Sequence, residues 1–399
     1  MLPVGTNLKL KKIPLATVSL LLTNWTIFIF LQMDYYKTYY WLTKYFKYIP
    51  GEQYPWQLIT SMFLHAGGFH ILGNSLYLWV FGIFVEDKAG WKAYVFLYFL
   101  TGIVANLVHG MMAGLFLRDN LFIPSLGASG AISGIMGVYL YRCYYSKVKL
   151  LISLWLPIRV QVPAVIILGL WFLQDFLGGI DSIRGIAQNV AFWAHVGGFV
   201  AGLGACKYLR YEIEARKERM EFVVDAKMDR FVGYGEGVEA CERLLDGDPA
   251  NPELHLKLAR SKSRWRASEE ARHHYEKAIK RLLPMDPEKA AEVSVEYWRK
   301  YLTVMEPRYQ ASLSRLINKY VDSDLSAKTL QALIDSNQPL DLHMEQAYLD
   351  LAKIYGQLGR DELAHHVYSR FLQKFPQSRH RAFAEKKLHV ISQGAALRG

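Results

Sequence analysis

Six long apolar segments divide the first half of the chain. The first, residues 14–33, contains no charged side chain, and about 20 apolar residues are enough for a helix to cross the hydrocarbon core of a bilayer. The other segments are residues 68–85, 91–117, 129–145, 162–177 and 189–209. Because a backbone in lipid must satisfy its own hydrogen bonds, all six are expected to be helices. The sequence predicts a polytopic bundle of six transmembrane helices.

Charge separates this bundle from the rest of the chain. Residues 1–206 carry 14 Lys and Arg against 7 Asp and Glu, whereas the remainder carries 33 against 29. The composition therefore changes near residue 207 from that of a membrane protein to that of a soluble one. We predict an all-α protein with a membrane domain over residues 1–210 and a soluble helical domain over residues 211–399.

The Lys and Arg residues near the predicted spans indicate an orientation. Six spans place both termini on one side, and that side carries nine of these residues before the soluble part, against five on the opposite side. The positive-inside rule then predicts cytoplasmic termini and an outward-facing Ser129 end of the fourth span. Since the basic excess lies beside apolar segments, we expect the lipid bilayer as a partner and no nucleic acid.

The N-terminal segment is typical of a retained membrane anchor. Lys9, Lys11 and Lys12 precede the first apolar run, as in a signal peptide, but no small-residue cleavage site follows. The lack of an Arg-rich, acid-poor leader argues against mitochondrial import and favours the inner (plasma) membrane of a bacterium. Residues 34–54 are rich in Tyr, Trp and Lys and are expected at the membrane surface.

Polar side chains in these spans need an explanation because they are costly in lipid. His195 lies in the sixth span, while His70 and Asn74, spaced i, i+4, share one face of the second. Histidines at that spacing can bind zinc, but the second position here is Asn74 and no H-E-x-x-H pattern occurs. The three cysteines have no C-x-x-C spacing, so neither a metal site nor a disulfide framework is predicted.

Ser129, at the start of the fourth span, and His195 form a candidate pair for acyl transfer. Serine becomes a nucleophile when a base takes its proton. Taken alone, Ser129 would be explained by helix packing, and the combination with His195 favours catalysis. Small residues would let the two helices approach closely enough for the side chains to meet. They are Gly130, Gly134 and Gly137 on the fourth span, and Gly198 and Gly202 on the sixth.

Donors for a developing oxyanion are also predicted. Ser129 starts a helix, whose free N–H groups and dipole favour negative charge. Asn74 and His70 could add side-chain donors. No Asp or Glu is expected in a position to orient His195, so the sequence predicts a Ser-His dyad. Asp175, in the apolar fifth span, is the only rival for such a role.

Three motifs give the chain a resemblance to rhomboid intramembrane serine proteases over about residues 14–209. They lie in family order on the second, fourth and sixth spans: H-x-x-x-x-H-x-x-x-N from His65 to Asn74, G-A-S-G from Gly127 to Gly130, and A-H-x-x-G-x-x-x-G from Ala194 to Gly202. The resemblance implies a six-helix bundle with Ser129 as nucleophile and His195 as general base. It also implies an oxyanion site from the amides around Ser129 and Gly130 together with Asn74 and His70, and a loop at Gly127 that approaches this site.

The same resemblance implies roles for three further segments. Residues 34–54 would form a membrane-embedded first loop, the fifth span with Trp171 and Phe172 would border the path of the substrate helix, and residues 178–188 would cap the site. Two positions depart from the family pattern. Ser133 replaces an aromatic residue that packs on the catalytic histidine in many members, so another contact must orient His195. Gln57 replaces an arginine after Trp56, which removes a charge from the anchoring of the first loop.

The soluble part contains two segments with a shared spacing that resembles tetratricopeptide repeats. The later copy comprises Tyr348, Leu351, Ala352, Tyr355, Gly359, Ala364, Tyr368 and Pro376. The earlier copy comprises Leu258, Ala259, Ala271, Tyr275 and Ala278. Stacked helix pairs of this kind would offer a concave surface to a peptide or protein partner. A helical bundle with chance matches is the alternative.

Together these features predict an intramembrane serine endopeptidase that hydrolyses peptide bonds in or near transmembrane segments. Its substrates would be single-span membrane proteins, and the reaction needs no cofactor. Two alternatives stay open: a catalytically inactive rhomboid-like scaffold, and an adaptor in which the repeats do the work and the bundle is an anchor.

Overall fold

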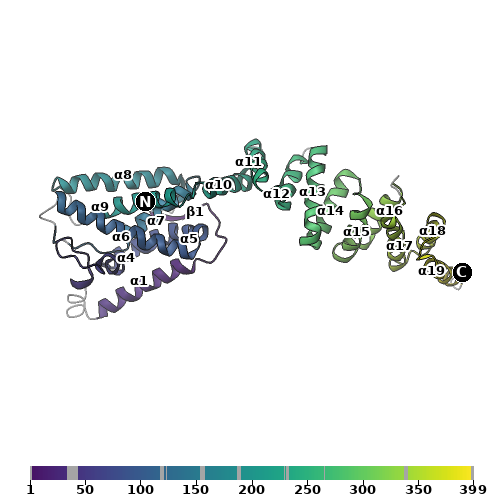
Figure 1. The fold of residues 1–399 in the computed structure, drawn as a ribbon, viewed down its shortest axis with the longest axis horizontal. Helices are drawn as coiled ribbons and strands as arrows, with labels where there is room; N and C mark the ends of the chain where they lie inside the picture. Colours follow the sequence, from purple (N-terminus) through teal and green to yellow (C-terminus); the bar gives the residue numbers. More distant parts are fainter. Residues whose placement is uncertain are drawn as a thin grey trace. The chain divides into compact units, whose positions relative to one another are not determined.

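The computed structural model describes residues 2–33, 44–116, 121–122, 124–152, 158–186, 190–228, 230, 233–264, 266–336 and 340–396. Two compact units can be distinguished, Met1–Arg219 and Met220–Gly399. Helices dominate both units (Figure 1), which confirms the predicted all-α class. Parts of two predicted segments, residues 34–43 of the first loop and 187–188 of the cap, lie outside the described residues.

Helical structure is present in all six predicted apolar segments. The elements are α1 (Leu15–Met33), the run from α4 (Gly68–Tyr77) through the π-helical η3 (Leu78–Gly82) to α5 (Ile83–Ala89), α6 (Trp91–Phe116), α7 (Ser129–Cys143), α8 (Ala164–Ile183) and α9 (Phe192–Tyr208). Within the described residues, three helices are long and apolar enough to cross a membrane: Gly68–Ala89, Trp91–Phe116 and Ala164–Ile183. The count of six spans therefore stays a prediction.

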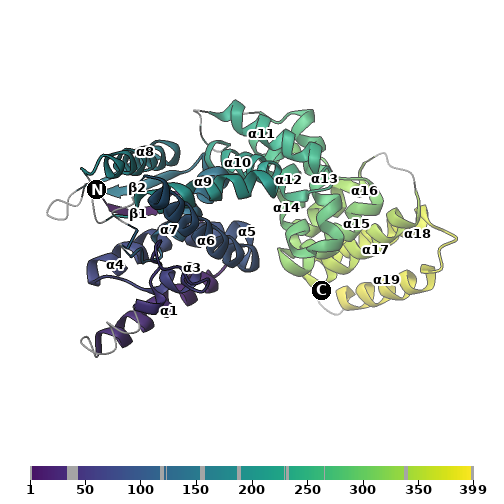
Figure 2. The ribbon, with the colours of Figure 1, turned by 60° about the vertical axis from the view of Figure 1, so that its left-hand side comes forward.

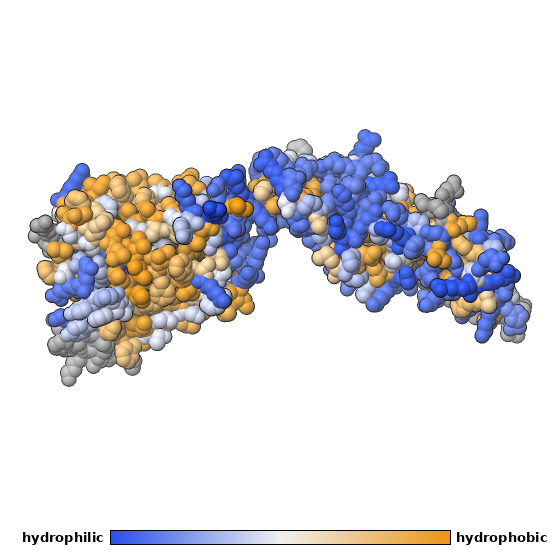
Figure 3. Space-filling view, in the orientation of Figure 1, coloured by the Kyte–Doolittle hydropathy of each residue, from blue (hydrophilic) through white to orange (hydrophobic). Residues whose placement is uncertain are grey.

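Helix α7 is short and rich in small residues because it lies inside the bundle. Nearly all of its side chains are buried, so it needs no long apolar side chains for lipid. The outer helices have the opposite character, with large apolar side chains exposed along α8, such as Leu170, Leu173 and Leu177. Figure 3 shows a broad apolar surface on this unit, whereas the surface of the C-terminal unit is mainly hydrophilic.

Helices α7 and α9 are in backbone contact. A Cβ atom on Gly198 would collide with the carbonyl oxygen of Gly130, and one on Gly202 with the carbonyl oxygen of Gly134. On its other side, Gly134 packs against the Thr101 side chain of α6. This approach determines the distance between the beginning of α7 and the beginning of α9.

A small antiparallel sheet, which the sequence analysis did not predict, joins the N-terminus to the segment between α7 and α8. Its strands are β1 (Leu2–Thr6), β2 (Lys147–Leu151) and β3 (Arg159–Pro163), in the order β1-β2-β3. Val148 and Leu150 are buried while the alternate lysines are more exposed, which is the period-2 pattern of a half-buried strand. Strand β3 runs directly into α8 and so positions the start of that helix.

Buried charges in the membrane unit cap or clamp helix ends. Glu86 of α5 accepts hydrogen bonds from the first N–H groups of α1, at Ala16 (2.8 Å) and Thr17 (2.7 Å). Arg142, near the end of α7, donates to Glu218 at 2.7 Å. A carboxylate at a helix N-terminus satisfies free N–H groups and the dipole together.

The C-terminal unit is a succession of helices, each packed on the next (Figures 1 and 2). They are α10 (Glu212–Lys227), which begins in the membrane unit, α11 (Tyr234–Gly247), α12 (Pro252–Lys262), α13 (Glu269–Met285), α14 (Pro287–Tyr301), α15 (Pro307–Tyr320), α16 (Ser323–Ile334), α17 (Leu342–Gln357), α18 (Asp361–Lys374) and α19 (Arg381–Ala396). Side-chain N-caps set many boundaries, as at Asn251, Ser268 and Asp341. Short α3 (Gln57–Thr60) and η2 (Ser61–Phe63) precede α4 in the membrane unit.

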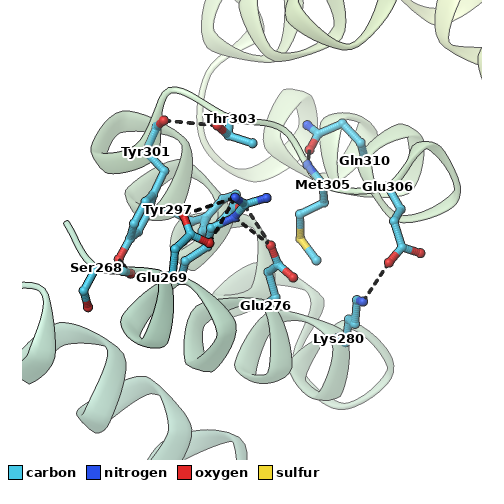
Figure 4. A network of polar contacts seen from close by, with 11 residues as sticks. Ser268, Glu269, Glu276, Lys280, Tyr297, Tyr301, Thr303, Met305, Glu306 and Gln310 are labelled. Carbon is cyan, nitrogen blue, oxygen red and sulfur yellow. Dashed lines mark hydrogen bonds and ion pairs between the residues drawn. The ribbon is translucent and has the colours of Figure 1, made fainter. Parts of the chain in front are cut away.

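Polar contacts tie α13, α14 and α15 to one another (Figure 4). Arg272 of α13 bonds to Glu276 on its own helix and to Tyr297 of α14, at 3.2 and 3.3 Å. Lys280 reaches Glu306, next to the start of α15, at 3.1 Å. These partly exposed pairs fix the order in which the helices stack more than they add stability.

The α7–α9 contact gives a first testable prediction. Gly202→Ala places a methyl group against the Gly134 carbonyl and should cost about 1–3 kcal/mol of stability. Gly204→Ala, on the same helix with open space around it, should be neutral or stabilise by up to about 1 kcal/mol. The measurement is the unfolding midpoint of the detergent-solubilised chain. Equal midpoints for both variants would contradict the packing.

A second prediction concerns pH and the His255–His274 contact, where the Nδ1 atoms are 2.8 Å apart. Burial, with His255 next in importance, lowers the pKa of His274 from 6.5 to about 4. Between pH 6.5 and about 4, His274 is therefore protonated in the unfolded chain and neutral in the folded chain. The stability of the folded chain should fall as pH drops through this range. His274→Gln should flatten this dependence in thermal unfolding, while exposed His343→Gln should leave it unchanged.

Candidate active site

The loop before α7 holds Ser129 in place. Tyr48 and Ser125 exchange backbone hydrogen bonds of 3.1 and 2.8 Å, and Gly127 N–H donates to the Ser61 carbonyl at 2.9 Å. Gly127 has a φ of +120°, which an L side chain rarely adopts. The helix then begins at Ser129, and the N–H groups of its first turn have no partner within the helix.

Ser129 meets His195 across the α7–α9 contact. Ser129 Oγ lies 2.9 Å from His195 Nε2, which is hydrogen-bond distance. The two residues are far apart in sequence, and the glycine contacts between their helices bring them together. The structure thus places the predicted nucleophile and base in direct contact.

Asp175 of α8 extends this pair to three residues. Its Oδ2 lies 3.2 Å from His195 Nδ1, and the carboxylate is buried. The expectation that no acidic residue can orient His195 is therefore wrong. Because a carboxylate only accepts, the proton of a neutral imidazole is on Nδ1, and Nε2 is free to accept from Ser129. The arrangement is serine, histidine and aspartate in the relation of a catalytic triad.

Trp171, one turn before Asp175 on α8, stacks on the imidazole. The ring centroids of Trp171 and His195 are 5.9 Å apart with an interplanar angle of 29°. Ser133, where the family pattern has an aromatic residue, donates instead to the Ser129 carbonyl at 2.6 Å. The ring that the sequence lacks at position 133 is therefore supplied from another helix.

His70 and Asn74 of α4 lie against Gly127. A Cβ on Gly127 would be 2.8 Å from His70 Nε2 and 3.5 Å from Asn74 Nδ2. Ala66 N–H donates to His70 Nδ1 at 3.3 Å, so the proton of a neutral ring is on Nε2. Asn74 Nδ2 is buried and has no acceptor among the described residues. The side-chain donors of His70 and Asn74 thus lie close to Gly127, two residues before Ser129.

The remaining predicted residues shape the site by packing. Gly130 lies against Ala105 of α6, and Gly134, Gly198 and Gly202 form the close contacts described above. Gln57 is buried, with its Oε1 accepting from Tyr54 N–H at 3.1 Å. The uncharged side chain therefore has a structural role of its own near the first loop.

Sequence reasoning named Asp175 only as a rival orienter of His195 and placed Trp171 beside the substrate path, so it did not predict that both contact His195. Their i, i+4 spacing puts them on one face of an otherwise uncharged helix, and this is the signal that could have found them. Among the described residues, no group of three or more His, Cys, Asp or Glu side chains could hold a metal ion.

Comparison with known proteins finds similarity in the part of the chain that contains these residues. Residues 52–212, which contain every site residue above, match the family model of the Rhomboid domain. Over these residues the chain is similar to the Rhomboid domain. The match begins after α1 and ends at the first residue of α10, so it leaves the C-terminal unit outside.

Curated relatives match in the same part of the chain. "RHOMBOID-like protein 1" of Arabidopsis thaliana is 33% identical over 147 residues, which are 37% of this chain and 32% of that protein. "Putative rhomboid protease YdcA" of Bacillus subtilis is 36% identical over 90 residues, 23% of this chain and 42% of that protein. "Inactive RHOMBOID-like protein 8" of Arabidopsis thaliana is 31% identical over 168 residues, which are 41% of this chain and 40% of that protein. The chain spans less than half the length of these relatives.

The contact between Gly127 and the α4 donors gives a third prediction. In Gly127→Ala the new methyl group meets the His70 ring, so reaction of Ser129 with a fluorophosphonate probe should slow by at least about tenfold, the effect of 1.4 kcal/mol. Gly90→Ala is the control, because Gly90 also has positive φ (+80°) but no neighbour within 4 Å. Equal labelling rates in both variants would contradict a role for this contact.

Proposed function

We propose that the protein is an intramembrane serine endopeptidase that cleaves peptide bonds in or near transmembrane segments of other proteins. The observation that carries the proposal is the 2.9 Å contact between Ser129 Oγ and His195 Nε2. Ser129 attacks the peptide carbonyl while His195 takes its proton and later passes it to the leaving amine. Water, activated by the same imidazole, then hydrolyses the acyl-enzyme.

The developing oxyanion would be stabilised by donors that surround the nucleophile. The backbone N–H groups at Ser129 and Gly130 belong to a helix N-terminus, where the dipole favours negative charge. Asn74 Nδ2, buried with no acceptor within the described ranges, and His70 Nε2 would complete this site. In this arrangement the donors need little rearrangement when charge develops.

A transmembrane substrate is supported by the surroundings of the site. Trp171, which stacks on His195, also lines a cavity of about 250 Å³ between β1, the α4–η3 run, α7 and α8, with Tyr77 and Met136 on its other walls. Apolar side chains are exposed along the adjacent α8, so a substrate helix can approach from lipid. The substrate must unwind locally, because a peptide bond inside a helix is shielded from attack. We expect single-span membrane proteins as substrates.

The location follows from charge. The positive-inside rule places both termini in the cytoplasm and the Ser129 end of α7 toward the outer side of a bacterial inner membrane. In this orientation the sheet β1–β3 and the buried Arg142–Glu218 pair lie at the cytoplasmic end.

The C-terminal unit is proposed to be tetratricopeptide-like and to recruit or regulate. The repeat positions Tyr348, Leu351, Ala364 and Tyr368 are buried, and Gly359 has a φ of +69° in the turn between α17 and α18. Successive packing of helices is the architecture of such repeats, whose concave face accepts peptides or proteins. A protein or peptide partner is therefore expected, and no nucleic acid.

The alternative is a catalytically inactive scaffold. It is favoured by one relative, which carries the word "Inactive" in its name. The presence of Ser129, His195 and Asp175 in mutual contact supports the active form instead.

Replacement of the nucleophile tests the proposal. Ser129→Ala should lower cleavage of a transmembrane reporter by at least about 1,000-fold, the scale at which serine proteases lose activity with their nucleophile. Ser19→Ala, on lipid-facing α1, is the matched control and should retain wild-type activity. Cleavage by the Ser129→Ala protein at the wild-type rate would refute the assignment, and wild-type protein that neither cleaves nor reacts with the probe would support the scaffold.

A further inference from the structure

We infer that Asp175 is a positioning residue for His195, so that α8 supplies the third member of a Ser-His-Asp triad. The orientation of the His195 imidazole then depends on the position of α8. The inference rests on the proposed function. It extends the Ser-His dyad that the sequence resemblance implies.

The hydrogen-bond geometry assigns this role. Asp175 Oδ2 is 3.2 Å from His195 Nδ1, on the side of the ring opposite Ser129. An acceptor there holds the proton on Nδ1 and leaves Nε2 as the base. It also stabilises the imidazolium that forms when His195 takes the proton of Ser129. The proton goes from Ser129 Oγ to His195 Nε2, and Asp175 stays ionised throughout.

Burial supports the same role. Asp175 is 6% exposed, and burying a carboxylate is costly unless it is paired. Within the described ranges, the ion pair that Asp175 makes is with His195, and no Lys or Arg pairs with it. An apolar residue at position 175 would pack in this lipid-facing helix without the cost of burying a carboxylate. The stabilisation of His195 explains why an aspartate is there instead.

Trp171 makes the dependence on α8 stronger. It lies one turn from Asp175, stacks on His195 and also lines the cavity beside α4. Both contacts that orient the imidazole from outside α9 therefore come from α8. Helix α8 packs on α9 at Gly179, which contacts the Trp193 ring. The Gly179 carbonyl also accepts a hydrogen bond from Trp193 Nε1 at 3.2 Å. A displacement of α8 away from α9 would separate His195 from both Asp175 and Trp171.

Charged neighbours determine what the loss of Asp175 would do. Among the described residues, His70 of α4, His109 of α6 and Asp175 of α8 are titratable side chains that act on His195, and Tyr77 of α4 acts on Asp175. Asp175 is the only carboxyl group among these side chains. Without it, the imidazolium loses its one stabilising charge among the described neighbours.

The test is Asp175→Asn in the full chain, with cleavage of the transmembrane reporter measured against pH. We expect kcat to fall at least 100-fold with little change in KM, and the acidic limb of the pH–rate profile to move down by one pH unit or more. Asp175→Glu, which keeps the charge, should recover part of the rate. Asp181→Asn is the matched control, because Asp181 is on α8 but exposed and paired with Arg184.

The outcomes separate this inference from the proposed function. If Ser129→Ala is inactive while Asp175→Asn keeps the wild-type rate and pH profile, the inference is wrong and the protease assignment stands. If Asp175→Asn and Asp175→Glu lose activity equally, with no shift of the acidic limb, Asp175 serves folding and the inference is also wrong. Reporter cleavage that persists in Ser129→Ala removes the protease assignment itself.

Discussion

Backbone contact between α7 and α9 is the constraint on which the site depends. The two helices approach until glycines meet carbonyl oxygens, Gly198 with Gly130 and Gly202 with Gly134. In lipid no hydrophobic force drives helices together, so small residues that permit close packing decide which pairs associate. This contact puts the first residue of α7 within hydrogen-bond distance of the fourth residue of α9. A serine and a histidine thereby come into contact inside an apolar bundle.

Three charged side chains buried in the membrane unit have partners from other helices. Glu86 caps α1, Arg142 pairs with Glu218, and Asp175 pairs with His195. Electrostatic interactions are stronger in such low-dielectric surroundings, and so is the penalty for a group left unpaired. Asn74 Nδ2, buried with no acceptor in the described part of the chain, fits a donor for a transient oxyanion. The low dielectric that makes polar groups costly here would also strengthen their interactions with the charges of a reaction.

Much of this arrangement could be predicted because a lipid environment restricts which residues a spanning helix can contain. Long apolar segments predicted where the helices are, and glycine spacing indicated which faces meet. Asp175 was underestimated, because its contact with His195 depends on how α8 lies against α9, which spacing along the chain does not define. The sheet was missed because the alternation of Lys147, Val148, Lys149 and Leu150 is brief and follows a long helical segment. Strand β1 also lies far from β2 in sequence, so their pairing could not be predicted from the local pattern.

The most direct test of the central claim is the covalent state of Ser129 after treatment with a fluorophosphonate, read by mass spectrometry in wild-type protein and in His195→Gln. The account predicts a single adduct on the peptide that contains Ser129 in wild-type protein and almost none in His195→Gln. An adduct formed equally well without the imidazole, or wild-type protein with no adduct at Ser129, would contradict a serine activated by His195.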